Sequence, residues 1–292
     1  MTKSTFVRRV YSRNVARLIS TLVLGVAIVG STVLGAQWPK YSIPGPKTAD
    51  GKPDLKGPTP RTADGKPDLS GVWETIQGRR GGGAAIAAEG TGELPPSGSI
   101  FGNVGDQTPG GAPYQPWAAE LVKKRMADNS KDNPDAHCLP MGVMQMTSHP
   151  YPKKIIQTPS ELIAIYEGSG TTVREIFLDG RVPAKDAEPW WNGYSVGHWE
   201  GETLVVETTG FVDDGWLDVR GSPFTSAGRM IERFRRPNYG SLVIDVTIDD
   251  PKAYTKPFTA TVNNRLLPDT QLIEFVCIDK SAQHYVGANG KP

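Results

Sequence analysis

The sequence predicts an all-β protein in which an antiparallel meander of strands closes as a lipocalin-like barrel. Short runs rich in Val, Ile, Thr and aromatic residues follow one another at close spacing from Pro152 onward. Turns of hairpin length join nearly all of them, so no long Greek-key crossing is needed. Glycine and proline supply 33 and 25 of the 292 residues, which is typical of a chain with many turns. A β-sandwich is the alternative fold, because a series of hairpins also builds sandwiches.

The individual strands follow from these runs and turns. The first is GVWETI at 71–76. Further strands are expected at 153–158, 161–167, 171–178, 193–199, 202–209, 229–236, 241–249, 256–267 and 271–278. The last eight form hairpins in sequential pairs, and one short amphipathic helix is expected to begin at Pro116. We therefore expect a single barrel domain over 71–286, with an irregular Gly/Pro-rich insertion at 78–135 and a tail at 287–292.

The first 36 residues have the composition of a segment that directs export. Five basic residues and no acid precede an uncharged run of 19 residues from Leu18 to Ala36, which is the form of a secretory signal. The run is almost long enough to span a bilayer, so an uncleaved N-terminal anchor is the alternative. Either segment would place the body outside the cytoplasm. We expect a periplasmic or extracellular protein that touches a membrane only through this segment, if it stays uncleaved.

Residues 37–70 are rich in Pro, Gly, Asp and Lys, and they contain the octapeptide TADGKPDL twice, fourteen residues apart. Two copies of so short a repeat cannot stack into a core, so this segment is predicted to be a linker. Beyond residue 36 the chain has 27 basic and 31 acidic residues. A mildly acidic body without a basic stripe argues against nucleic acid as a partner.

Cys138 and Cys277 are the two cysteines of the chain, and both lie in the part expected to be exported. In an oxidising compartment such a pair is expected to form a disulfide, and two separate buried thiols are the alternative. Neither cysteine lies in CxxC spacing, and no two histidines lie in HxxxH spacing. The sequence therefore predicts no metal site and no cofactor.

Strand alternation sorts the acidic residues by face. Glu232 falls on the same face of its strand as Met230 and Phe234, so its carboxylate is expected to point into the barrel. Glu175 and Glu207 also stand among apolar neighbours, although the opposite faces of their strands are apolar too. A carboxylate inside a barrel must be paired, hydrogen-bonded or neutral, which makes all three candidates to line a ligand cavity.

His198 is a candidate for proton transfer, because it lies at the end of a strand and titrates near neutral pH. It forms a candidate catalytic acid/base pair with Glu232, and the alternative is a simple turn residue. Residues 193–197 match the G-x-S-x-G pattern of hydrolases around Ser195. The sequence continues there as a strand rather than as the helix of a nucleophile elbow, so we expect no nucleophile at this position.

Aromatic side chains gather between residues 190 and 224. Aromatic walls with a few polar groups often line the mouth of a ligand cavity, although the same side chains can plug one end of a barrel. The predicted ligand-binding residues are Trp190, Trp191, Tyr194, Trp199 and Trp216, together with Glu175 and Glu207.

Longer blocks of the sequence resemble a group of exported bacterial proteins without established function. The blocks are CLP…G (138–142), REIFLDGR (174–181), GYSVGHWEGETLVVETTGF (193–211), ERFRRP (232–237), DVTIDDPKAYTKPF (245–258) and LIEFVC (272–277). The similarity covers roughly 134–286 together with the GKPDLSGVW lead-in, and it implies export without pointing to catalytic residues. Gly71 and Trp73 in GVW also resemble the G-x-W opening of lipocalin-like barrels.

Three functions fit these features. The first is an exported barrel that binds a small apolar or aromatic molecule in its lumen. The second is an enzyme (a lyase, isomerase or hydrolase) that uses Glu232 with His198 or an arginine in the same pocket. The third is a structural protein of the cell envelope. The enzyme hypothesis requires that Glu232, His198 and Glu175 meet in one cavity.

Overall fold

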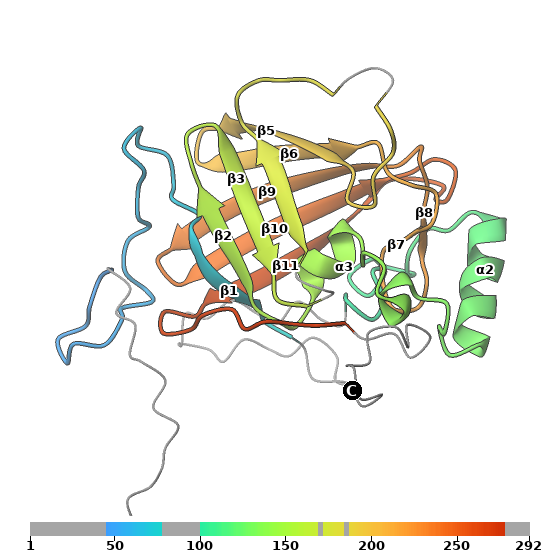
Figure 1. The fold of residues 1–292 in the computed structure, drawn as a ribbon, viewed down its shortest axis with the longest axis horizontal. Coiled ribbons are helices and arrows are strands. Elements are labelled where there is room, and N and C mark those ends of the chain that lie inside the picture. Colours follow the sequence, from blue (N-terminus) through green and yellow to red (C-terminus); the bar gives the residue numbers. More distant parts are fainter. Residues whose placement is uncertain (1–44, 78–99, 169–171, 184–186, 278–292) are drawn as a thin grey trace, which may run out of the picture. The chain divides into compact units, whose positions relative to one another are not determined.

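The structure is a computed structural model that describes residues 45–77, 100–168, 172–183 and 187–277 of the chain (Figure 1). The predicted signal or anchor at 1–36, residues 78–99 of the insertion and the tail at 287–292 lie outside these residues. Within the described part, nine strands form a closed barrel and two more form a separate pair. The all-β barrel predicted from the sequence is confirmed, and the sandwich alternative is excluded because the sheet closes on itself.

The strands follow one another around the ring in the order β1-β11-β10-β9-β6-β5-β4-β3-β2. Their bounds are β1 Gly71–Thr75, β2 Lys153–Gln157, β3 Glu161–Tyr166, β4 Val173–Phe177, β5 Tyr194–Glu200, β6 Thr203–Thr209, β9 Arg229–Asn238, β10 Ser241–Asp249 and β11 Phe258–Leu266. A ring with an odd number of strands cannot alternate in direction at every junction. The junction of β4 with β5 is parallel, and the other eight are antiparallel. An eight-stranded lipocalin barrel has no such junction.

Three of the four predicted hairpins form, between β3 and β4, β5 and β6, and β9 and β10. The turn after β5 contains Gly201 with φ +59°, the left-handed conformation that a tight hairpin turn requires. The fourth hairpin prediction is wrong, since β11 pairs with β1 and residues 271–277 form no strand. Closure is the reason: β10 and β1 occupy both edges of β11 and leave none for a further strand.

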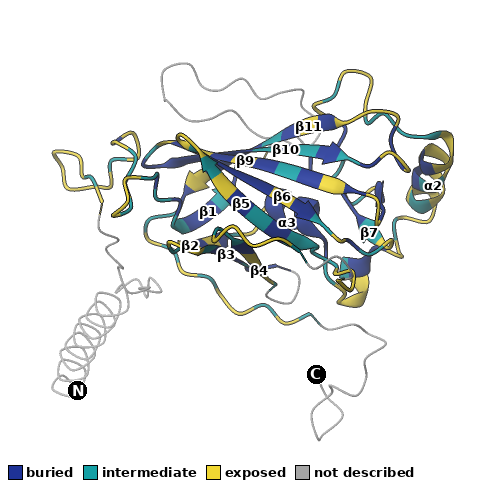
Figure 2. Cartoon of the chain, turned by 90° about the horizontal axis from the view of Figure 1, so that it is seen from above, coloured by how far each residue is buried: buried dark blue, intermediate teal, exposed yellow. Residues whose placement is uncertain are grey.

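Many residues of the barrel strands are buried, as the dark blue segments of the strands in Figure 2 show. Alternate residues of each strand point inward, as in β10, where Leu242, Ile244 and Val246 are buried. Trp73 of β1 is completely buried, and its indole N–H donates to the Leu69 carbonyl at 3.0 Å. A small barrel is expected to be packed in this way rather than hollow. A ligand in the lumen, as the sequence led us to expect, would have to displace these side chains.

Helices and a short strand pair cover one end of the barrel, at the right in Figure 1. The predicted helix is present as α2. A second α-helix, α3, and a 3-10 helix, η1, were not predicted from the sequence. The bounds of these elements are α2 Pro116–Ala127, η1 Pro134–His137, α3 Val143–Ser148, β7 Gly215–Trp216 and β8 Pro223–Phe224.

Helix α3 packs into this end of the barrel, and all six of its residues are buried. The Thr147 carbonyl accepts a hydrogen bond from Lys153 Nζ at 2.9 Å, and Gln145 Nε2 donates to the Trp216 carbonyl at 3.1 Å. A short helix that is buried on every side has no alternation of apolar and polar residues. Hydrophobic periodicity therefore gave no signal for α3.

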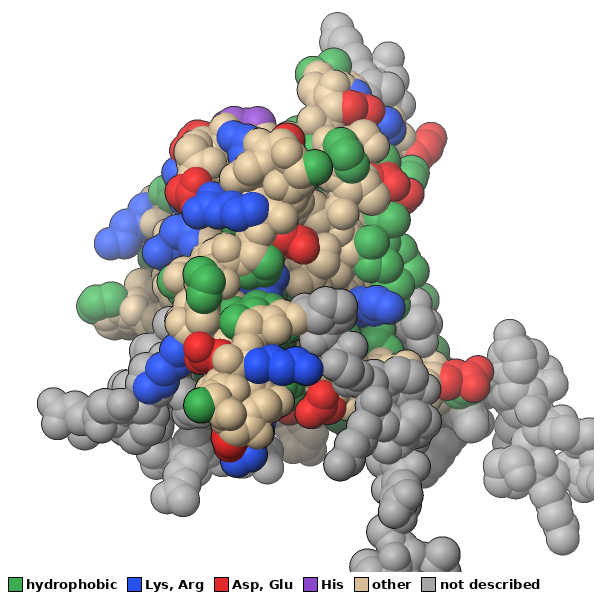
Figure 3. All heavy atoms as spheres, turned by 90° about the vertical axis from the view of Figure 1, so that its left-hand side faces the viewer, with side chains coloured by type: hydrophobic (Ala, Val, Ile, Leu, Met, Phe, Trp, Pro, Cys, Tyr) green, Lys and Arg blue, Asp and Glu red, His purple; other side chains and the backbone are tan. Residues whose placement is uncertain are grey.

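Residues 45–70 pack against the barrel instead of forming the linker predicted from the sequence. Both copies of TADGKPDL make the same turn, in which the amide of the glycine donates to the threonine carbonyl at 2.9 Å. Gly51 and Gly65 have φ values of +81° and +80°, which favour glycine. Arg236 of β9 fixes the second copy, since its Nη1 donates to the Asp68 carbonyl within the copy and, at 3.1 Å, to the Ser70 carbonyl just after it. Basic and acidic side chains are interspersed on this face of the molecule (Figure 3).

Cys138 and Cys277 are joined by a disulfide with a Cα–Cα distance of 5.6 Å, as the sequence predicted. The bridge ties the end of η1 to the segment after β11, which is irregular rather than the strand that we expected. Among the residues that the structure describes, no helix has the length and apolar character needed to cross a membrane.

Candidate functional site

The parallel junction of β4 with β5 contains only two residue pairs, Ile176 with Ser195 and Phe177 with Val196. A pocket of about 170 Å³ lies beside it, and we call it the seam pocket. Arg174 and Glu175 line it from β4, Tyr194 and Ser195 from β5, and residues 190–192 from the segment before β5. Four of the predicted ligand-binding residues therefore meet at one place.

A turn over residues 190–193 places two tryptophans at the pocket. Gly193 N donates to the Trp190 carbonyl at 3.1 Å, and Trp190 N donates to the Gly210 carbonyl at 2.9 Å. Gly193 has φ +61°, and a Cβ at this position would lie 2.7 Å from the Thr209 carbonyl oxygen. Glycine is therefore required here. The Trp190 and Tyr194 rings meet edge to face with their centroids 6.5 Å apart.

Asn192 lines the seam pocket and carries an unused hydrogen-bond acceptor. Its Oδ1 is buried and has no hydrogen-bond partner within the described part of the chain. An unpaired buried acceptor costs free energy, which a donor group on a bound molecule would recover. Trp190, with 57% of its surface exposed, forms an outer wall of the pocket.

Arg174 and Ser195 form the buried inner end of the pocket. Arg174 Nη1 donates to Glu232 Oε1 at 3.0 Å and Nη2 pairs with Oε2, so the two side chains form a bidentate ion pair. Nη2 also donates to Ser195 Oγ at 3.0 Å and to Thr208 Oγ1 at 2.9 Å. Burial alone would lower the pKa of the guanidinium, but the Glu232 carboxylate outweighs burial and holds that pKa above its ordinary value.

Glu232 faces the inside of the barrel, as strand alternation predicted, and it is fully buried. It orients Arg174 and is not itself part of the pocket lining. His198 lies on the outer face of β5, where its side chain is 68% exposed and Nε2 is 3.2 Å from Glu200 Oε1. The predicted acid/base pair of Glu232 and His198 is therefore wrong, because the two side chains lie on opposite sides of the barrel wall.

The other predicted ligand-binding residues lie elsewhere. Trp199 contacts Lys66, whose Nζ is 5.9 Å from the ring centroid, and it does not line the seam pocket. Trp216 is buried beneath the guanidinium of Arg125, whose Cζ lies 4.2 Å from the centroid of the indole ring. Glu207 lies on the outer face of β6, where Oε1 is 3.9 Å from Arg229 Nη1. The aromatic cluster of the sequence is thus divided among separate parts of the barrel.

A second buried polar group surrounds Lys153 on the inner face of β2. Its Nζ donates to Thr75 Oγ1 at 2.8 Å and to the Thr147 carbonyl, and no carboxylate pairs with it among the described residues. Burial lowers the pKa of Lys153 to about 7. Burial, and then repulsion from Lys153, lowers the pKa of His149 to about 4. Neither side chain lines the seam pocket.

Three residues of the seam pocket were not predicted as site residues from the sequence: Arg174, Asn192 and Ser195. A signal for Arg174 was present, because it alternates with Ile176 and so faces inward like Glu232. Two inward charges of opposite sign imply a pair. Ser195 lies within β5 rather than at a strand–helix elbow, so the continuous strand expected from the sequence is confirmed here.

The seam pocket combines aromatic walls with an unpaired acceptor and a guanidinium already neutralised by a carboxylate, an arrangement suited to binding a ligand. Across the described ranges, no group of three or more His, Cys, Asp or Glu side chains is arranged to hold a metal ion. Comparison with family models, with curated proteins and with solved structures finds no match for this chain. Function therefore has to rest on the geometry of the site.

Proposed function

We propose that this protein is exported and binds a small aromatic molecule carrying a hydrogen-bond donor in the seam pocket. The observation that carries the proposal is the convergence of Trp190, Trp191 and Tyr194 with the unpaired Oδ1 of Asn192. Such a combination is typical of ligand pockets. An engineered protein cavity of about 150 Å³ binds benzene, so the seam pocket has room for a single ring with a small substituent.

The inner end of the pocket favours a neutral ligand. The Ser195 hydroxyl is fixed by Arg174 and by Thr208, whose Oγ1 lies 3.0 Å away. Glu232 compensates the charge of Arg174, so an anionic ligand would gain little from the guanidinium. The ligand class is therefore a neutral single-ring aromatic molecule rather than an aromatic acid, and nucleic acid is not the expected partner.

Export is supported by two separate features. Residues 1–36 combine a basic start with an uncharged run, the form of a secretory signal or an N-terminal anchor. The Cys138–Cys277 disulfide belongs in an oxidising compartment, because cytosolic thiols are kept reduced. The resemblance to exported bacterial proteins points the same way.

Calorimetric titration with phenol and with toluene tests the binding proposal, because these probes share a ring and differ in one hydrogen-bond donor. Phenol is expected to bind at least about tenfold more tightly, since toluene would leave the Asn192 acceptor unpaired. The substitution Asn192→Leu removes the acceptor and should abolish this preference. Equal binding of both probes by the native protein, or an unchanged preference in the variant, would contradict the proposal.

Two exposed tryptophans provide a matched control for the site. Trp190 and Trp117 are 57% and 46% exposed, but Trp117 lies on α2 and does not line the seam pocket. Trp190→Ala should weaken phenol binding, whereas Trp117→Ala should leave it unchanged. Losses of equal size in the two variants would show that phenol binds somewhere else.

A further inference from the structure

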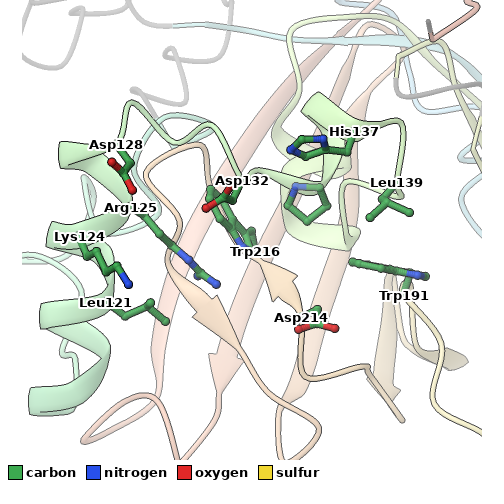
Figure 4. Close-up of a pocket in the computed structure, with 11 residues that line it drawn as sticks. Leu121, Lys124, Arg125, Asp128, Asp132, His137, Leu139, Trp191, Asp214 and Trp216 are labelled. Atoms are coloured by element: carbon green, nitrogen blue, oxygen red, sulfur yellow. The ribbon is translucent and has the colours of Figure 1, made fainter. Parts of the chain in front are cut away.

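A second and larger pocket, of about 410 Å³, lies beside helix α2 (Figure 4). We call it the α2 pocket, because Lys124 and Arg125 of that helix form one wall. Trp191 and Leu139 stand on the opposite side. Three carboxylates also line the pocket, those of Asp128, Asp132 and Asp214, and Asp128 Oδ2 already pairs with Lys131 Nζ at 3.6 Å. Trp191 is also part of the seam pocket, and the two pockets share no other lining residue.

Arg125 is held in one orientation in the α2 pocket and has unused hydrogen-bond donors. Its Nη1 donates to the Gly221 carbonyl at 2.7 Å, and its guanidinium lies 4.2 Å from the ring centroid of Trp216. The remaining nitrogens, Nε and Nη2, have no acceptor within the described part of the chain. A guanidinium held in one orientation with free donors is well suited to bind a carboxylate.

Asp132 and Asp214 supply the opposite charge. Both lie close enough to Arg125 to oppose the lowering of its pKa by burial. Neither carboxylate forms a hydrogen bond or an ion pair with any other described residue, and the ammonium group of Lys124 also has no such partner. A ligand with a single charge would meet a like charge in this pocket, whereas a ligand with both charges would find a partner for each.

We propose that the α2 pocket binds a free zwitterionic amino acid with a large apolar side chain. Its carboxylate would accept hydrogen bonds from the free donors of Arg125 and from Lys124. Its ammonium group would bind the carboxylates of Asp132 and Asp214, and its side chain would pack against Trp191 and Leu139. This site does not depend on the ligand proposed for the seam pocket.

Three probes with the same phenyl ring test separately whether the pocket recognises the carboxylate and the ammonium group of the ligand. They are L-phenylalanine, 3-phenylpropionate, which lacks the ammonium group, and phenethylamine, which lacks the carboxylate. Each is titrated into the isotope-labelled exported protein while the indole N–H resonances are followed by NMR. Trp216 lines the α2 pocket only, and Trp190 lines the seam pocket only, so the two resonances report on the two sites separately.

L-Phenylalanine should shift the Trp216 resonance and bind at least about tenfold more tightly than either other probe. If phenethylamine binds equally tightly, the pocket is a site for organic cations, and if 3-phenylpropionate does, it is a site for anions. Either result overturns the proposal. An unchanged Trp216 resonance with all three probes overturns it as well.

The double substitution Asp132→Asn with Asp214→Asn tests the ammonium end. Both side chains are exposed and make no hydrogen bond to other described residues, so the fold should persist. L-Phenylalanine binding should weaken about tenfold, while 3-phenylpropionate binding should not weaken. Asp269→Asn removes an exposed carboxylate that does not line the pocket and should change neither. Unchanged phenylalanine binding in the double variant would also refute the proposal.

Discussion

At the scale of single residues, Glu232 and Arg174 show the cost of placing charge inside the barrel. Their side chains are 0% and 2% exposed, and each compensates the other. Glu232→Gln keeps the shape but leaves the guanidinium uncompensated, so the free energy of unfolding should fall by about 3–5 kcal/mol. Urea unfolding measures this change.

Glu200→Gln is the matched control for this prediction, because Glu200 pairs with Arg233 on the exposed outer surface. It should have little effect on the unfolding free energy, since water screens exposed pairs. Similar losses in the two variants would mean that the Arg174–Glu232 pair is not protected from solvent.

The buried Lys153 predicts a specific pH dependence. Its pKa is lowered from 10.5 to about 7 in the folded protein, so between these values the unfolded chain binds more protons. The unfolding free energy therefore rises with pH across this window, and the full cost of burying the charge is present below pH 7. Urea unfolding should show that the native protein gains a few kcal/mol relative to Lys153→Met between about pH 7 and 10. If the difference in unfolding free energy between the two proteins stays constant over this pH range, Lys153 remains protonated in the folded protein.

At the scale of elements, the duplicated octapeptide offers a comparison of two identical leucines in identical turns. Leu69 of the second copy is completely buried against the barrel, whereas Leu55 of the first copy is 39% exposed. Leu69→Ala should lower the unfolding free energy by about 2–5 kcal/mol, because it leaves a cavity in the core. Leu55→Ala should cost distinctly less in the same urea measurement. Equal decreases in the unfolding free energy would mean that the two copies pack equally well against the barrel.

At the scale of the whole molecule, the disulfide closes a loop with a sequence separation of 139 residues. On the chain-entropy model such a bridge stabilises the folded state by about 5 kcal/mol. Reduction with dithiothreitol should lower the urea midpoint accordingly, and thiol titration of the unfolded, unreduced protein should find no free sulfhydryl. Two free thiols in the unreduced protein would refute the bridge.

The sequence by itself determined the features that depend on neighbouring residues. Alternation along a strand has a period of two, so the inward direction of Glu232 was readable from Met230 and Phe234. Glycine at turns marked the hairpin after β5, and the presence of two cysteines indicated the disulfide. These properties are set by local backbone geometry and composition.

The tertiary structure alone decided which distant edges and side chains meet. Strand β1 takes the free edge of β11, so the strand expected at 271–278 has nowhere to pair. Arg174 reaches Glu232 across 58 residues, and Trp191 lies at two pockets that no stretch of sequence outlines. His198, one of the two predicted catalytic residues, lies on the outer face of the barrel and therefore cannot meet Glu232. Closing the barrel sets these contacts through burial and pairing between remote segments, which local periodicity does not encode.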